Sequence, residues 1–391
     1  MVIAYFKNVL NHNSQNMKTP MQITKNQSRR KFLTALPLAT LAACEKSETQ
    51  KISSPQIRSQ INWKMVTTWP KDFPGLGTGA NYLAQLISKM SNGELKIKVF
   101  GAGELVPALG VFDAVAGGTA EIGHSTAYYW KGKHEATQFF STVPFGLTAQ
   151  EINGWLQYGG GQQLWDEIYA PFGLKAFPAG NTGVQMGGWF NQEINSIEDF
   201  SGLVIRMPGL GGEVLRRLDA TVQTIPGGEI FQALKTGAID ATEWVGPYND
   251  LAFGFHQAAK YYYWPGWHEP GTVMEAMINQ KAWNQLPKDL QCIVQSACST
   301  VNDHMLAEFT ARNSTALETL VNEHGVQLRK FSNEILNSIG EISKDVIHEI
   351  AEKDPLTKKV YSSFIEFRKN SLAYTRISEE AYTLARSLTP N

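Results

Sequence analysis

The sequence alternates between strand-like and helix-like patterns of apolar residues. Strands are predicted at 61–68 and 94–100, and a helix with apolar residues three and four positions apart is predicted at 80–90 between them. A second helix at 111–117 and a short strand near Ile122 complete this series. Strands that alternate with helices usually form a largely parallel sheet covered by helices. This part of the chain therefore predicts an α/β lobe.

The same alternation starts again after residue 174. Its predicted strands lie at 175–177, 184–190, 203–207 and 241–245, and its predicted helices lie at 211–218 and 230–236. The chain has 391 residues, and a single hydrophobic core usually stops growing at ~250–300 residues. We therefore expect a second α/β lobe.

A long helical pattern follows Pro287 and continues for about 35 residues. A helix of that length spans ~50 Å at 1.5 Å per residue, so it can support both lobes. A strand is predicted at 326–331, followed by two further helical runs at 335–350 and 360–384. The last run exceeds what two lobes need, so it is free to cover a surface or to pair with a second subunit.

The N-terminal region carries an arginine pair at 29–30, followed by an apolar run at 32–43 and then by Cys44. The run is shorter than the ~20 residues that cross a bilayer. The pattern resembles a twin-arginine export signal, and the sequence LAAC that ends at Cys44 resembles a lipoprotein cleavage box. A chance arginine pair in a basic tail is the alternative. We expect export to the periplasm, with Cys44 as the residue that would carry a lipid anchor and 45–60 as a polar tether.

Charge and motif content exclude several classes of protein. The chain has 35 Lys and Arg against 36 Asp and Glu, so it lacks the net positive charge that favours nucleic acid or an anionic membrane. We expect no nucleic-acid partner. The eight His show no HExxH spacing and no expected metal cluster, and no Ser lies in GxSxG. Cys292 and Cys298 lie among apolar residues of the long helix, so we expect buried thiols rather than nucleophiles. We predict no catalytic residues and no enzyme activity.

A glycine-rich turn at 75–80 reads GLGTGA and matches the GxGxxA pattern of dinucleotide-binding turns. In those turns the glycines follow the strand directly, whereas here a segment with Pro70 and Pro74 intervenes. An NAD-dependent oxidoreductase therefore stays only as an alternative. The sequence PGLG occurs at 74–77 and again at 208–211, each time before a predicted helix. Both turns suit either close approach of a small anion or simple entry into a helix.

Three polar side chains come from predicted strands of the second lobe. Arg206 ends an apolar strand, where a guanidinium can hold a carboxylate through two hydrogen bonds or pair with a structural acid. Gln185 and Glu243 lie in two other predicted strands. We expect the three to meet between the lobes. Oxygen ligands from Gln and Glu, with no His or Cys nearby, suit Na⁺ or Ca²⁺.

Several of these segments resemble the solute receptors of TRAP (tripartite ATP-independent periplasmic) transporters, the DctP family. The matching segments are LVP at 105–107, FDAV at 112–115, GGTAEIG at 117–123, IRMPG at 205–209 and GAIDA at 237–241. The resemblance extends from about Trp63 to the long helix. It implies an α/β, two-lobed fold like that of periplasmic binding proteins, with a long lobe-spanning helix and an extra C-terminal helix. It also implies a receptor that closes around a solute and passes it to membrane subunits.

Three further segments resemble the branch that binds 2-oxo or 2-hydroxy monocarboxylates, such as pyruvate or lactate, with a metal ion. They are NTGVQMGGW at 181–189, PGLGGE at 208–213 and EWVGPY at 243–248. The resemblance implies Arg206 for the substrate carboxylate and Gln185 for both substrate and ion. The implied ion ligands are Gln185, Glu243, the Trp244 carbonyl and Glu269, and Glu269 also borders the substrate. Candidate pocket walls from the first lobe are Trp69, Tyr128, Tyr129 and Phe145.

The summed charge of these residues and of a bound monocarboxylate indicates which cation would fit the site. Arg206, Glu243 and a monocarboxylate sum to −1, which Na⁺ neutralises. If Glu269 also points inward as a carboxylate, the sum is −2 and Ca²⁺ fits better, because an uncompensated buried charge costs several kcal/mol. The resemblance further implies a homodimer that pairs through the C-terminal helix. A ligand-sensing module for a signalling receptor would share this pocket, so it stays as a second alternative.

The patterns and the resemblance together divide the chain into five segments. We predict an export signal (1–44), a tether (45–60), lobe I (61–183 and 272–311), lobe II (184–271 and 312–356) and a C-terminal helix available for dimerisation (357–391).

Overall fold

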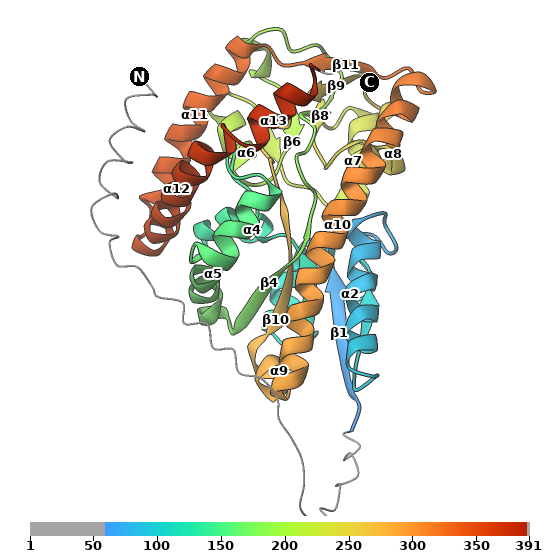
Figure 1. Ribbon diagram of the computed structural model, residues 1–391. Helices are drawn as coiled ribbons and strands as arrows, with labels where there is room; N and C mark the ends of the chain where they lie inside the picture. Colours follow the sequence, from blue (N-terminus) through green and yellow to red (C-terminus); the bar gives the residue numbers. More distant parts are fainter. Residues whose placement is uncertain (1–58, 389–391) are drawn as a thin grey trace, which may run out of the picture. The chain divides into compact units, whose positions relative to one another are not determined.

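The computed structural model describes residues 59–388, and its strands form two separate sheets (Figure 1). The first sheet has the strand order β2-β1-β3-β10-β4. Its strands are β1 (Ile61–Thr67), β2 (Leu95–Phe100), β3 (Ile122–Ser125), β4 (Leu174–Asn181) and β10 (Val273–Asn279). β1 pairs in parallel with β2 and β3, whereas β10 is antiparallel to β3 and β4. The sheet is thus parallel where strands alternate with helices and antiparallel where the chain returns from the second sheet.

The second sheet has the strand order β11-β9-β5-β8-β6-β7. Its strands are β5 (Gly188–Phe190), β6 (Val204–Arg206), β7 (Thr221–Gln223), β8 (Ala241–Thr242), β9 (Tyr261–Trp264) and β11 (Gln327–Lys330). β6 lies between β7 and β8 and pairs in parallel with both. These observations confirm the predicted α/β class. The strands of the two sheets fall within the residue ranges given above for lobes I and II, whose boundaries stay predictions.

The α-helices lie between and after these strands. They are α2 (Leu76–Met90), α3 (Val111–Ala116), α4 (Ala149–Tyr158), α5 (Gly161–Tyr169), α6 (Gly209–Arg216), α7 (Gly227–Thr236), α8 (Pro247–Phe253), α9 (Gln280–Gln285), α10 (Lys288–Asn322), α11 (Asn333–Ala351), α12 (Pro355–Thr375) and α13 (Glu379–Arg386). A 3₁₀ helix at Ala127–Trp130 also contributes to the site described below.

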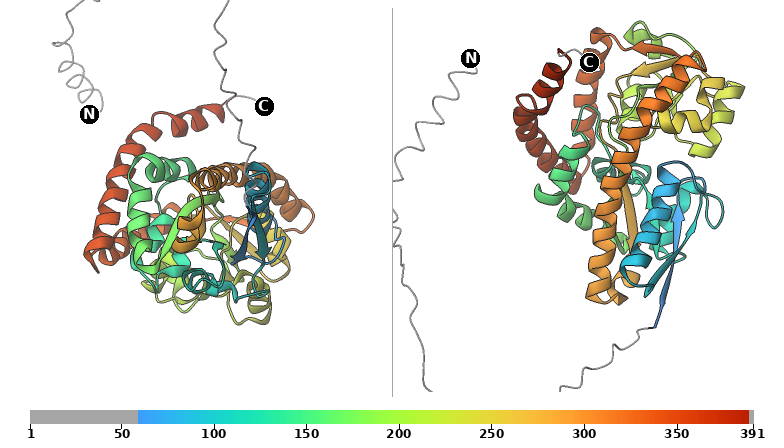
Figure 2. Two further views of the ribbon diagram at one scale, coloured as in Figure 1. Left: turned by 90° about the horizontal axis from the view of Figure 1, so that it is seen from below. Right: turned by 45° about the vertical axis from the view of Figure 1, so that its right-hand side comes forward.

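α10 is the predicted long helix, and it has 35 residues. It packs against β4 and α2 on the side of the first sheet and against α8 on the side of the second. In the right-hand view of Figure 2, the orange helix runs past the blue α2 and continues beside the yellow segment of the second lobe. Its buried residues include Val294, Val301, Met305 and Phe309, so one apolar face follows the helix across both lobes. The prediction that this helix supports both lobes is confirmed.

Several predicted element boundaries were wrong. α2 begins at Leu76, four residues before the predicted start. Its first turn tolerates Gly77 and Gly79, whose missing side chains allow close contact with Pro70 and Met305. Residues 184–187 are not a strand: Gln185 and Met186 donate their amides to the carbonyls of Glu269 and Val245 instead of to a ladder. The predicted helix at 360–384 is two helices, α12 and α13.

The two cysteines of α10 differ in environment. Cys298 is buried, and burial raises its pKa to about 12. Cys292 is exposed, so the prediction of a buried thiol was wrong for this residue. The reason is helical geometry, since six residues correspond to a rotation of ~240° and place the two side chains on different faces.

α12 and α13 complete the described chain. α12 packs against α4 and α5, as the neighbouring ribbons in Figure 1 show, and it buries Val360 and Phe364. α13 has no buried residue. From residue 59 to residue 388, no helix is both long and apolar enough to span a membrane. The predicted export signal with Cys44 and all but the end of the predicted tether lie outside the described residues.

Candidate functional site

Arg206 is the last residue of β6, and its side chain is fully buried. Nη1 forms an ion pair with the Glu243 carboxylate and also donates to the Glu243 carbonyl at 3.2 Å. Nη2 donates to the Tyr129 hydroxyl at 3.0 Å, and Nε donates to the Ile225 carbonyl at 3.3 Å. Of the two roles that the sequence left open, pairing with an acid is therefore observed. Four of the five guanidinium N–H donors have acceptors within residues 59–388, which leaves one N–H on Nη2.

Glu243 and Trp244 follow the short strand β8. The Glu243 carboxylate is fully buried, and its Oε2 atom has no hydrogen-bond partner among the described residues. The Trp244 ring packs over the Arg206 guanidinium at 5.1 Å. Gly227 at the start of α7 is so close to this ring that a Cβ atom there would overlap it. The segment that carries Glu243 and Trp244 is thus held by contacts from β6 and α7.

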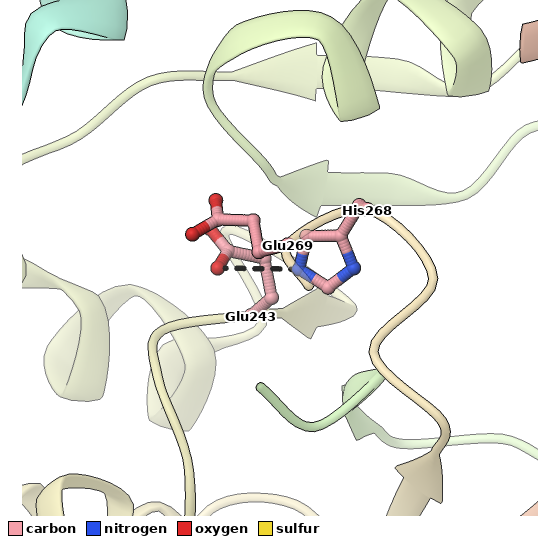
Figure 3. A group of neighbouring side chains, drawn as sticks. All are labelled: Glu243, His268 and Glu269. Atoms are coloured by element: carbon pink, nitrogen blue, oxygen red, sulfur yellow. Dashed lines mark ion pairs between the residues drawn. The ribbon is translucent and has the colours of Figure 1, made fainter. Parts of the chain in front are cut away.

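His268 and Glu269 lie in the loop between β9 and β10, next to Glu243 (Figure 3). One ligand atom from each of these three residues lies within 4.8 Å of the others. His268 Nε2 is 3.5 Å from Glu243 Oε2, and both His268 ring nitrogens lack a hydrogen-bond partner among residues 59–388. The predictions that no His belongs to a metal-type cluster, and that none lies near the expected ligands, were therefore wrong. The signal was present in the sequence, because His268 directly precedes Glu269.

Gln185 lies on the loop before β5 and contacts the same cluster. Its amide nitrogen Nε2 donates to the Thr182 hydroxyl at 3.1 Å and to the Thr272 hydroxyl at 3.3 Å. Thr272 in turn donates to Glu269 Oε2 at 2.6 Å. The Gln185 Oε1 atom is buried and has no partner within the described part of the chain. Thr182 and Thr272 were not predicted from the sequence, although both set the orientation of predicted ligands.

The electrostatics of this cluster favour a cation. Burial, and then the neighbouring charge of Glu243, raise the pKa of Glu269 well above its usual range. Buried acceptors without donors cost free energy unless a proton or a metal satisfies them. Gln185 Oε1 and Glu243 Oε2 are such acceptors, and Glu269 adds a third oxygen group. Carboxylate and amide oxygens are ligands that Ca²⁺ and Na⁺ accept, so the residues fit the ion that the sequence suggested.

Tyr128 and Tyr129 reach the site from the 3₁₀ helix Ala127–Trp130, on the side of the first sheet. Tyr129 accepts a hydrogen bond from Arg206, as described above. Tyr128 packs against Gly209, where a Cβ atom would be 3.3 Å from the Tyr128 Cβ. Burial, and then the charge of Glu269, raise the pKa of Tyr128. Both tyrosines therefore border the cluster and stay protonated at neutral pH.

Trp69 lies two residues after the end of β1 and is buried beside Trp244, with ring centroids 6.2 Å apart in an edge-to-face arrangement. Its indole nitrogen donates to His124 Nδ1 at 2.8 Å. Burial lowers the pKa of His124 to about 4, so His124 is neutral at pH 7 and can accept this bond. The first lobe thus contributes an aromatic side chain to the surroundings of Trp244.

Phe145 occupies a different position from the other candidate walls. Its ring stacks on Trp267, with centroids 6.1 Å apart, and Trp267 precedes His268. Phe145 also lines a cavity of about 310 Å³ that includes residues of α11 and α12. The structure therefore places Phe145 behind the loop that carries His268 and Glu269.

The glycines at 75–80 are explained by packing within the protein. A Cβ atom at Gly75 would lie 2.7 Å from the Phe309 ring, and one at Gly79 would overlap Met305, both on α10. A Cβ at Gly77 would lie 2.7 Å from the Pro70 carbonyl oxygen. These close approaches account for the glycines without a bound dinucleotide.

Comparisons with known proteins identify the family. Residues 65–354 match the model of the DctP family, described as bacterial extracellular solute-binding protein, family 7. A monocarboxylate 2-oxoacid-binding periplasmic protein of Nostoc sp. is 45% identical over 360 residues, which cover 90% of this chain and 97% of that protein.

Two solved structures have the same fold. A TRAP periplasmic solute-binding protein from Colwellia psychrerythraea with bound calcium and pyruvate is 43% identical and has a TM-score of 0.81, covering 83% of this chain and 99% of that one. The corresponding protein from Pseudoalteromonas atlantica, with bound sodium and pyruvate, gives the same identity, coverage and TM-score. The two-lobed solute-receptor fold implied by the sequence is thereby confirmed, and the chain belongs to the DctP family of bacterial extracellular solute-binding proteins.

Proposed function

We propose that this protein is the receptor of a TRAP transporter and binds a small 2-oxo or 2-hydroxy monocarboxylate, such as pyruvate or lactate, together with a cation. The observation that carries this proposal is the buried cluster of Arg206, Glu243 and Glu269 together with Gln185 Oε1, which has no hydrogen-bond partner among residues 59–388. The ligands named for the Nostoc, Colwellia and Pseudoalteromonas proteins support it. A carboxylate and an adjacent C2 oxygen can chelate one cation in a five-membered ring, which explains the preference for 2-oxo and 2-hydroxy acids.

We assign the site residues as follows. The cation takes Glu243 Oε2, Gln185 Oε1, the Trp244 carbonyl and Glu269, while Glu243 Oε1 stays on Arg206. The substrate carboxylate accepts from Arg206 Nη2, beside the Tyr129 hydroxyl. Arg206 therefore does not hold the substrate carboxylate through both of its terminal nitrogens, because Nη1 already pairs with Glu243. Trp69 and Trp244 form an apolar wall, and His268 borders the cation.

Charge balance relates the choice of ion to the protonation of Glu269, whose pKa is raised by burial and by the charge of Glu243. When a bound cation ionises Glu269, Arg206 contributes +1, and Glu243, Glu269 and the bound acid each contribute −1, so the closed site sums to −2. A divalent ion neutralises this charge, and burial makes an uncompensated charge costly. Na⁺ becomes suitable when Glu269 keeps a proton.

The receptor carries out no chemistry on its ligand. Within the described chain, the glycine turn at 75–80 that would hold a dinucleotide is filled by Phe309, Met305 and Pro70, which disfavours the oxidoreductase alternative. The protein acts in the periplasm and delivers its ligand to the membrane subunits of the transporter. Cys44 is the residue that would carry a lipid anchor.

The C-terminal helices pair two copies of the chain. This proposal is supported by α13, which has no buried residue and presents large apolar side chains to solvent. A homodimer would cover them.

Binding measurements on the purified protein test the function. Calorimetry with pyruvate, lactate and succinate, each with Ca²⁺, with Na⁺ and after chelation, should show cation-dependent binding of the two monocarboxylates only. Native mass spectrometry of protein purified without added ligand should detect a retained acid and ion. The proposal fails if none of the acids binds, or if NAD raises the melting temperature and pyruvate does not.

A further inference from the structure

The C-terminal helix α12 is hydrogen-bonded to the loop behind the ligand site. Arg368 on α12 donates from Nε and Nη2 to the carbonyl of Phe145, at 2.9 and 2.6 Å. The Arg368 side chain is half-buried, and burial lowers the pKa of its guanidinium. A guanidinium that gives two charge-assisted hydrogen bonds to one carbonyl fixes the position of that peptide group.

Phe145 has an unusual backbone conformation. Its φ angle is +52°, in the left-handed region that a bulky residue seldom adopts. Such a conformation costs of order 1–3 kcal/mol and persists only when surrounding contacts hold it. Arg368 holds its carbonyl, and on the other side the Phe145 amide donates to the Trp267 carbonyl at 2.8 Å. Phe145 is therefore fixed between α12 and Trp267.

Trp267 belongs to a tight turn that carries two residues of the cation cluster. The Trp267 amide donates to the Pro265 carbonyl at 3.0 Å, and the Glu269 amide donates to the Gly266 carbonyl at 3.3 Å. Gly266 in turn donates to the carbonyl of Gln185 at 3.0 Å, so the turn is packed closely on another residue assigned to the cation. A displacement of Trp267 would therefore move His268 and Glu269 relative to Gln185 and Glu243.

We propose that Arg368 is a positioning residue for the ligand site. By holding Phe145 in its left-handed conformation, Arg368 fixes Trp267 and keeps Glu269 and His268 beside Glu243. The C-terminal helix thus contributes to affinity and does more than cover the surface of α4 and α5. This inference rests on the proposed function for its ligand, but the contacts that carry it are independent of which acid is bound.

Another set of contacts on α12 provides a matched control. Ser371 and Thr375 both donate to Glu151 Oε1 on α4, at 3.0 and 2.7 Å. These bonds attach the same helix to the first lobe without contacting Phe145. If α12 acts only by stabilising the fold, loss of either set should have the same effect on ligand affinity.

The test compares Arg368→Ala with the double variant Ser371→Ala/Thr375→Ala. Calorimetry with pyruvate and Ca²⁺, well below the melting temperature, should show affinity at least roughly tenfold weaker for Arg368→Ala, a change that small displacements of ligating groups can produce. The double variant should lower the melting temperature yet keep the wild-type affinity within twofold. Arg368→Lys, which retains a cationic donor, should restore part of the affinity.

Hydrogen exchange separates this inference from the proposed function, because it needs no ligand. Arg368→Ala should accelerate exchange of the Gly266, Trp267 and Glu269 amides in the unliganded protein, and the double variant should not. If the wild-type protein binds no acid, the proposed function fails while the exchange result still decides the positioning role. Unchanged exchange in Arg368→Ala, or an affinity equal to that of the wild type, overturns the inference.

Discussion

The Arg206 guanidinium and the Glu243 carboxylate form an ion pair in which both side chains are fully buried. Two charges at such a position compensate one another, so removal of one partner leaves the other uncompensated. Loss of one partner of a buried ion pair typically costs ~3–5 kcal/mol. The pair therefore links the stability of the second lobe to the groups that we assign to substrate and cation.

Arg206→Ala should weaken acid binding beyond detection and lower the free energy of unfolding by ~3–5 kcal/mol, because Glu243 is left as a buried, unpaired charge. Denaturant unfolding and calorimetry measure the two effects. Arg206→Ala/Glu243→Gln removes that charge, so it should regain stability without regaining acid binding. If Arg206→Ala binds pyruvate with unchanged affinity while folded, the assigned site is wrong.

Glu269→Gln should change the choice of cation. The substitution reduces the summed charge of the closed site from −2 to −1, so Ca²⁺-dependent binding of pyruvate should weaken by roughly tenfold or more while Na⁺ supports binding better than before. Calorimetry in Ca²⁺ and in Na⁺ after chelation measures this. Glu229→Gln, at an exposed position on α7, is the control and should change neither value. An identical cation response in Glu269→Gln and wild type would show that Glu269 is not a ligand.

Gly227 and Gly228 offer a matched pair for the Trp244 segment. Both lie in the first turn of α7, but a Cβ atom at Gly227 would overlap the Trp244 ring, whereas one at Gly228 would be 3.9 Å from Pro70. Gly227→Ala should cost ~1–3 kcal/mol by overpacking and should weaken acid binding, because it displaces Trp244. Gly228→Ala should be neutral or slightly stabilising, since alanine favours helix. Equal affinities for both variants would argue against Trp244 as part of the site.

The sequence predicted the architecture better than the details of the site. Alternating patterns identified most strands of the two sheets and the 35-residue α10, because apolar periodicity reflects the layers that bury each element. β10 was not predicted, since its seven residues are all buried and show no alternation between two faces.

Contacts between distant segments could not be predicted from the spacing of residues in the sequence. His268 was set aside because no second His lies at ligand spacing, yet folding brings it to Glu243, 25 positions earlier in the sequence. Phe145 was a candidate pocket wall, but its ring stacks on Trp267 and its carbonyl accepts from Arg368, far along the chain. Site residues that lie within one sequence motif were identified, whereas the residues on other elements that hold them in place were not.

Stability should fall as pH rises from about 4 to about 7. Burial raises the pKa of Asp250 from 3.8 to about 7 in the folded protein, where its carboxylate accepts from Trp189, Tyr262 and Val245. Between these pH values the folded state keeps a proton that the unfolded state has released, so this group stabilises the fold at low pH and loses that contribution as pH increases through its folded pKa. The contribution is on the order of 4 kcal/mol. Burial also raises the pKa of Glu275 to about 7, so the contribution of Glu275 to stability changes with pH in the same direction.

Denaturant unfolding at pH 5 and pH 8 measures this dependence. Asp250→Asn should reduce the difference between the two pH values, because the amide does not titrate. Asp240→Asn, at a half-buried position, is the control for an Asp→Asn change elsewhere in the second lobe. If the wild type is equally stable at both pH values and Asp250→Asn does not alter the difference in stability between them, Asp250 is ionised in the folded protein.

The C-terminal region should mediate dimerisation. It exposes large apolar side chains over a short stretch: Tyr374 is 70% exposed, Ile377 66%, Tyr382 67%, Leu384 63% and Leu388 85%. A cluster of this kind is usually covered by a partner, and here a second copy of the same chain is the expected partner. Light scattering after size exclusion should give a dimer for the mature protein and a monomer after deletion of residues 376–391. Leu384→Glu should weaken the dimer while the melting temperature of the lobes stays unchanged, because α13 buries none of its residues against them. A wild-type monomer at micromolar concentration, or a dimer that survives the deletion, would place the contact elsewhere.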